Sequence, residues 1–174
     1  FLQGYAAAAP RLGQLLTVSL ADFPAYAAQE DEACFVEWME VYFDCPLTRC
    51  GITLVDTPGA DSINARHTEA SFDFIRRSDA VLFVTYYNHA FSRVDREFLI
   101  QLGRVKDAFE LDKMFFIVNA IDLAADEQEK NEVLAYVRSQ LLKYGVKAPQ
   151  LYALSSQQLL TQKLAGRKER PAFE

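Results

Sequence analysis

Three short polar clusters contain the side chains of this sequence that are best suited to binding chemistry. They are Asp56-Thr57-Pro58-Gly59, Asn119-Ala120-Ile121-Asp122 and Ser155-Ser156. Each cluster directly follows a short apolar run, and such runs bounded by turn residues are typical of buried strands. Ligands of open α/β sheets bind beyond the carboxyl ends of the strands. We therefore expect the three clusters to lie at one edge of a sheet and to form a binding site there.

The first cluster suits the phosphate end of a nucleotide. Asp56, at the end of a strand, can hold Mg²⁺, usually through a water molecule, beside the phosphates. Gly59 follows Pro58 and lets the backbone approach a ligand closely, so that its N–H can contact the terminal phosphate. Asp-Thr-Pro-Gly is also good turn chemistry, so by itself this cluster does not separate a metal ligand from a turn residue.

The second and third clusters suit a guanine base. The carboxylate of Asp122 can accept two hydrogen bonds at once. Guanine offers two adjacent donors on its Watson–Crick edge, whereas adenine presents an acceptor there. The amide of Asn119 can tie the base-binding loops together. The backbone N–H groups around Ser155 and Ser156 can reach the purine carbonyl oxygen.

The elements that must position these clusters alternate along the chain. Strands are predicted at 51–55, 80–86, 114–118 and, more weakly, 150–154, with a strand end at 41–43. Helices are predicted at 69–77, 92–109, 127–144 and 157–164. Ser92 with Asp95 fits a capping box, and Gly145 fits a helix C′ position. The alternation predicts an α/β fold, a doubly wound and mostly parallel sheet with helices on both faces.

Composition excludes several classes of protein. The chain has 174 residues, of which 51% are hydrophobic, so one packed domain is expected rather than disorder. The formal net charge of -6 argues against non-specific nucleic-acid binding, which needs clustered basic residues. No apolar run is long enough to span a bilayer. Three cysteines without a CxxC pair make structural zinc and a disulfide framework unlikely candidates, and the cytosol is the simplest compartment.

In this order, the motifs resemble those of GTPases. Asp56-Thr57-Pro58-Gly59 resembles the DxxG switch motif, and Asn119-Ala120-Ile121-Asp122 resembles the NKxD base-reading motif. Ala153-Leu154-Ser155-Ser156 is similar to the weaker base-binding loop that follows. A lone DxxG is weak evidence, but the three motifs in order at strand ends are strong in combination.

A closer resemblance is to the dynamin family, and within it to bacterial dynamin-like proteins. It rests on Asp44-Cys45-Pro46-Leu47 running into 51–59, on Ala60-Asp61-Ser62-Ile63-Asn64-Ala65-Arg66-His67, and on Tyr86-Tyr87-Asn88-His89-Ala90-Phe91. It implies a P-loop GTPase-type fold that binds GTP or GDP with Mg²⁺ and hydrolyses GTP. It also implies a second switch at 60–67, self-association through the GTPase domain, and membrane remodelling through other domains. The expected location is cytoplasmic and peripheral to a membrane.

Two departures from the family pattern matter. No G-x-x-x-x-G-K-[ST] phosphate loop occurs in the sequence, and the threonine of the first switch is also missing. We therefore expect an amino-terminally truncated domain that is inactive alone. It would comprise a lead-in at 1–40, the sheet and helices at 41–165, and a loose tail at 166–174. In addition, Ala120 replaces the usual lysine, whose stem would lie along the purine, and this lowers the expected affinity more than the base selectivity.

Three other interpretations stay open at this point. The chain could be part of a pseudo-GTPase scaffold that has lost its phosphate loop. It could also be an ATPase of similar topology, in which Asp122 only caps the next helix. His67 and His89 could act as general bases. Neither histidine has an evident carboxylate or nucleophile partner in the sequence, so surface roles are favoured for both.

Overall fold

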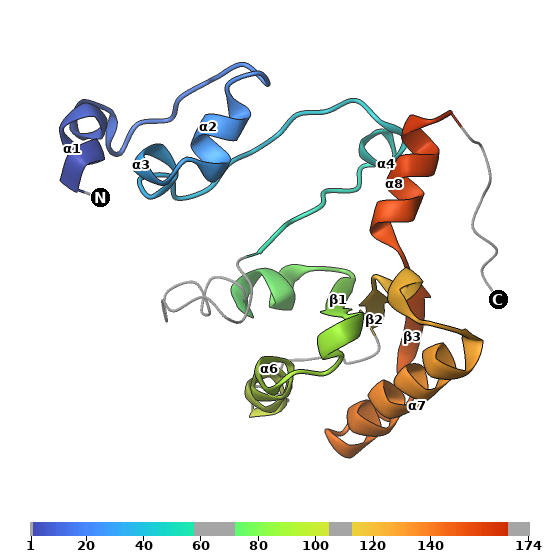
Figure 1. The fold of residues 1–174 in the computed structure, drawn as a ribbon. Coiled ribbons are helices and arrows are strands. Elements are labelled where there is room, and N and C mark those ends of the chain that lie inside the picture. Colours follow the sequence, from blue (N-terminus) through green and yellow to red (C-terminus); the bar gives the residue numbers. More distant parts are fainter. Residues whose placement is uncertain (1, 58–71, 105–112, 167–174) are drawn as a thin grey trace. The chain divides into compact units, whose positions relative to one another are not determined.

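The computed structural model describes residues 2–57, 72–104 and 113–166 (Figure 1). The chain divides into two compact units, Phe1–Leu54 and Val55–Glu174. The expected boundary between residues 40 and 41 falls inside the first unit. All of the candidate site residues belong to the second unit, so that unit positions the site.

The first unit consists of short helices. These are α1 (Leu2–Ala8), η1 (Ala9–Arg11), α2 (Phe23–Ala28), α3 (Glu30–Ala33) and α4 (Pro46–Arg49). The guanidinium of Arg11 donates to both carboxylate oxygens of Glu32, at 3.0 and 3.1 Å. The backbone of Gly4 lies so close to the Asp31 carbonyl that a Cβ there would collide with it. Residues 41–43, predicted as a strand end, form no strand.

The second unit contains a three-stranded parallel sheet. Its strands β1 (Val81–Tyr86), β2 (Met114–Asn119) and β3 (Gln150–Leu154) lie in the order β1-β2-β3. The helices are one at 72–77, α6 (Arg93–Arg104), α7 (Glu127–Lys143) and α8 (Ser156–Leu164). The short helices η2 (Tyr87–His89) and η5 (Ile121–Leu123) follow β1 and β2. Parallel strands joined through helices confirm the predicted α/β class.

The predicted helix ends agree with the structure where it describes them. At the start of α6, the Asp95 carboxylate accepts from the Ser92 N–H at 2.8 Å, and the Asp95 N–H donates to the Ser92 hydroxyl at 3.2 Å. This is the reciprocal pair of a capping box. After α7, Gly145 has a φ of +92°, the left-handed conformation that a helix C′ residue commonly adopts.

The hydrophobic core of the second unit lies on one face of the sheet. In β2, the side chains of Met114, Phe116 and Val118 are at most 2% exposed. They pack with apolar residues of α6 and α7, among them Leu102 and Leu141. Parallel crossovers are almost always right-handed. Because both crossovers step in the same direction along the sheet, α6 and α7 lie on the same face.

The opposite face of the sheet is open in the part of the chain that the structure describes. Leu82, Val84 and Tyr86 alternate with the core positions of β1 and are 59%, 54% and 49% exposed. Buried parallel sheets usually have both faces covered. Helices on the second face therefore stay a prediction for a longer polypeptide.

The strand predicted at 51–55 is wrong. Gly51 lies in a turn with a φ of +78°, and residues 52–55 form no strand. The side chains of Ile52, Leu54 and Val55 are 45%, 72% and 53% exposed. Apolar, β-branched composition favours a strand, but a strand also needs a neighbouring edge with which to exchange hydrogen bonds.

Among the described residues, no helix is long and apolar enough to cross a membrane.

Candidate nucleotide-binding site

The carboxyl ends of the three strands form one edge of the sheet. Tyr86 pairs with Asn119, and Asn119 pairs with Leu154, so the strands end at the same level. The loops that follow therefore emerge side by side, with η5 in contact with both η2 and β3. Two of the three predicted polar clusters follow β2 and β3 directly and meet at this edge.

A hydrogen bond joins the loops after β2 and β3. The side-chain oxygen of Asn119 accepts from the backbone N–H of Ser156 at 3.0 Å. Ser155 is 6% exposed and is the N-cap of α8, where its hydroxyl accepts from the Gln158 N–H at 3.2 Å. The Ser156 N–H is thus used within the protein, so it is not a free donor for a ligand as the sequence had suggested.

Asp122 presents its carboxylate to solvent at this edge. It lies in the middle of η5, is exposed, and makes no hydrogen bond or ion pair with any described residue. The N-cap of α7 is Asp126, whose carboxylate accepts from the Glu129 N–H at 2.8 Å. The interpretation of Asp122 as the cap of this helix is therefore wrong, and its two oxygens are available to a ligand.

Ala120, between these two residues, has a left-handed backbone with φ 63° and ψ 36°. This conformation turns the chain from β2 into η5, where the Leu123 N–H donates to the Ala120 carbonyl at 3.1 Å. The methyl group cannot supply the stem that a lysine at this position would lay along a purine. The loop shape is present without that side chain.

The first polar cluster is not gathered with the other two among the described residues. Asp56 and Thr57 lie outside any helix or strand, the Asp56 side chain is exposed, and no hydrogen bond joins either residue to the sheet. Pro58, Gly59 and the predicted switch at 60–67 lie outside the described residues. Within residues 2–57, 72–104 and 113–166, no group of three or more His, Cys, Asp or Glu side chains could hold a metal ion. Mg²⁺ at Asp56 would need ligands from elsewhere.

The loop after β1 is held by a buried network that the sequence did not reveal. Thr85, 6% exposed, donates to the Asp95 carboxylate at 3.0 Å, and its hydroxyl accepts from the Phe91 N–H at 3.1 Å. Phe91 is buried with a φ of +61°. The predicted capping box accounts for the Ser92–Asp95 bonds of this network. The bonds of Thr85 could not be predicted, because a threonine inside a strand run does not indicate a buried partner.

The histidines gain no catalytic partner from the structure. His89 ends η2 and is exposed, without a hydrogen bond to any described residue. A general base needs a positioned partner within hydrogen-bonding distance, and the part of the chain described here supplies none. His67 lies outside the described residues.

A parallel sheet with polar loops fixed at its carboxyl edge has the arrangement at which α/β domains bind their ligands. Comparison with known proteins identifies the family of the chain, because residues 16–121 match the dynamin family. The chain belongs to the dynamin family. No solved structure shows significant similarity to it.

Two similar proteins place the chain within larger proteins. It is 51% identical over 148 residues to "Dynamin-like protein A" of Bacillus subtilis, covering 85% of the chain and 12% of that protein. It is 27% identical over 125 residues to a "Probable transmembrane GTPase FZO-like, chloroplastic" of Arabidopsis thaliana, covering 71% of the chain and 13% of that protein. The chain thus spans about an eighth of the length of these relatives.

Proposed function

We propose that the chain forms most of a guanine-nucleotide-binding domain, and that the intact protein hydrolyses GTP. The observation that carries this proposal is the exposed Asp122 carboxylate beside the Asn119–Ser156 hydrogen bond. The bond fixes the two loops that would surround a base, and the carboxylate is left free to accept two donors at once. Guanine has that donor pair, and adenine does not.

Phosphate binding completes the proposed site in the intact protein. The Gly59 N–H would contact the terminal phosphate, and Asp56 would hold Mg²⁺ through a water molecule. Hydrolysis in such domains depends mainly on positioning and on electrostatic stabilisation of the transferred group. Because the 174-residue chain contains no G-x-x-x-x-G-K-[ST] loop, we expect it to bind GTP weakly and to hydrolyse almost none by itself.

Family membership supports the proposal of a wider role. We propose that residues 60–67 form a switch that the terminal phosphate orders, and that two GTPase domains associate. In the intact protein, other domains would bring this domain to the cytoplasmic surface of a membrane that the protein remodels.

The experiment that tests the proposal measures GTP and ATP binding by calorimetry, using the domain with its native upstream residues restored and Mg²⁺ present. The variant Asp122→Asn replaces one acceptor oxygen with a donor amide and should abolish the preference for GTP. Asp126→Asn is the matched control. It removes the same charge four residues away but keeps a good N-cap, so GTP binding should be unchanged.

Either of two results would overturn the proposal. Equal binding of GTP and ATP would favour an ATPase of similar topology. No nucleotide binding at all would favour a pseudo-GTPase scaffold that acts through protein interactions.

A further inference from the structure

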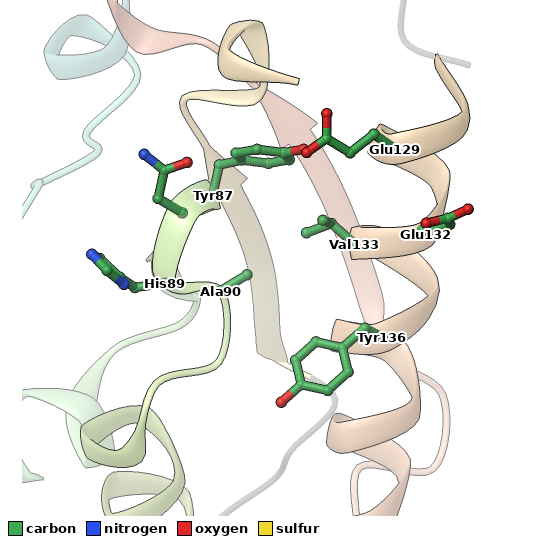
Figure 2. Close-up of a pocket in the computed structure, with 8 residues that line it drawn as sticks. Tyr87, His89, Ala90, Glu129, Glu132, Val133 and Tyr136 are labelled. Carbon is green, nitrogen blue, oxygen red and sulfur yellow. The ribbon is translucent and has the colours of Figure 1, made fainter. Parts of the chain in front are cut away.

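A second concave site lies between η2 and the first turns of α7. It is an open pocket of about 430 Å³ (Figure 2). Glu129, Glu132, Val133 and Tyr136 line its α7 side, and Tyr87 and Ala90 line the side of η2. The α7 residues are spaced three and four apart, which places them on one side of the helix. None of these residues belongs to the proposed nucleotide site.

The pocket carries the negative charge of Glu129 and Glu132, and Asn88 and His89 complete its lining. Glu129 is held in place because one of its carboxylate oxygens accepts from the Ala125 N–H at 2.7 Å. Glu132, at the edge of the pocket, accepts from the neutral amide of Gln128 at 2.9 Å. Among the described residues, neither carboxylate forms a salt bridge, whereas Glu127 on the same helix pairs with Lys130 at 3.1 Å.

Tyr87 has a buried polar group at this site. The residue is 6% exposed, and its hydroxyl makes no well-formed hydrogen bond with any described residue. Figure 2 shows the ring extending across the pocket toward Glu129. Burial first, and then the neighbouring Glu129 carboxylate, raise the pKa of Tyr87. Buried hydroxyls normally have a partner, and a ligand N–H beside Glu129 could donate to the phenol oxygen.

The remaining lining suits the rest of a long cationic side chain. Val133 and Ala90 are half-buried and apolar, and they can cover a methylene stem. Tyr136 is 47% exposed and lies two turns of α7 from Glu129 (Figure 2), so its ring can pack against the same stem. A guanidinium matches this combination better than an ammonium, because it is planar and donates several N–H bonds in fixed directions to two neighbouring oxygens.

We propose that the pocket between η2 and α7 binds an arginine side chain presented by a partner polypeptide. The guanidinium donates to Glu129 and to the oxygen of the Tyr87 hydroxyl, and its methylene stem passes Val133 toward Tyr136. Glu132 adds negative potential at the edge. The site does not depend on the proposed nucleotide function, because none of its residues takes part in base or phosphate binding.

The test is an NMR titration of the full 174-residue chain with the peptide acetyl-Gly-Arg-Gly-amide. Two matched peptides carry citrulline, the neutral isostere of arginine, or lysine in its place. We expect saturable shifts at the backbone amides of 87–90 and 129–136 with the arginine peptide. The lysine peptide should bind more weakly, and the citrulline peptide should give no saturation.

The variant Glu129→Gln keeps an acceptor for the Ala125 N–H but removes the charge. We expect it to weaken binding about two- to fivefold, the range of a solvent-exposed ion pair. Glu127→Gln is the control, because it removes a charge from the same helix outside the pocket, and it should leave affinity unchanged. The amide spectrum of each variant checks that it is folded.

Several results would overturn the proposal. These are equal binding of the arginine and citrulline peptides, equal binding of the lysine peptide, absence of binding, and affinity unchanged in Glu129→Gln. Shifts at the pocket that grow with protein concentration, and that the arginine peptide does not reverse, would identify another part of a second copy of the chain as the occupant and would also contradict the proposal.

Discussion

At the scale of single residues, the backbone of Ala120 shows how the candidate site is shaped. Ala120 has a left-handed backbone conformation (φ 63°). A Cβ makes this conformation unfavourable, and the methyl group of alanine forms no hydrogen bond that would offset the cost. The Asn119–Ser156 bond on one side and the Leu123–Ala120 bond on the other surround this residue. A strained conformation of this kind persists only when its surroundings determine it. The loop geometry is therefore imposed by its neighbours rather than by Ala120 itself.

Ala120→Gly should stabilise the chain. Glycine adopts a positive φ without a Cβ penalty, so we expect the free energy of unfolding to rise by about 0.5–1 kcal/mol. The same substitution in the middle of α7, Ala135→Gly, should lower it by about 1 kcal/mol. Urea denaturation of both variants measures the difference. A lower stability for Ala120→Gly would mean that the loop is not left-handed there.

At the scale of elements, the junction between β1 and α6 depends on Thr85. Its hydroxyl links the strand to the Asp95 carboxylate at the start of α6 and to the N–H of Phe91. Because Thr85 and Phe91 are both buried, water cannot replace these bonds easily. The network fixes the path of the chain from β1 through η2 to α6.

Thr85→Val should destabilise the second unit although it keeps the shape of the side chain. The buried Phe91 N–H loses its acceptor, and such a loss costs about 1–3 kcal/mol. Thr161→Val on the exposed side of α8 is the control and should change stability by less than about 0.5 kcal/mol. Chemical denaturation compares the two variants. Equal stabilities would show that the buried network contributes nothing.

The elements that could be predicted are those that depend on residues within their own segment. The helix expected at 127–144 is found at Glu127–Lys143, because its apolar period and its terminal residues lie within the segment. The strands at 80–86, 114–118 and 150–154 were found within a residue of their limits. The run at 51–55 has the composition of a strand but forms none. Pairing depends on residues distant in sequence.

The same distinction applies to the candidate site. The position of Asn119, Asp122 and Ser155 at strand ends could be predicted, because ligands of α/β sheets bind there. The left-handed Ala120 could not, because alanine ordinarily favours helices. The pocket between Tyr87 and Glu129 could not be predicted either, because it combines residues from η2 and α7 that are far apart in sequence.

At the scale of the whole molecule, the one-sided sheet makes the context of the chain testable. Leu82 is 59% exposed, so Leu82→Ala in the 174-residue chain should cost less than about 1 kcal/mol. In a longer protein that covers the second face, the same change should cost about 2–5 kcal/mol. Thermal or chemical denaturation of both forms measures the change in stability.

Leu102→Ala provides the matched control for this comparison. Leu102 is 1% exposed in the core, so its loss should cost about 2–5 kcal/mol in both forms. A small effect of Leu82→Ala in the longer protein, beside a large effect of Leu102→Ala, would mean that the second face stays open to solvent.

The strands of the sheet end at the same level, and this alignment limits where residues can be inserted or deleted. Side chains in a strand alternate between faces, so one residue deleted within β2 would exchange its two sets of side chains. Phe115 and Ile117 would turn into the core, and the amide of Asn119 would leave the side on which it bonds to Ser156. Insertions and deletions should therefore be tolerated in the loops before the strands but not, one residue at a time, inside them.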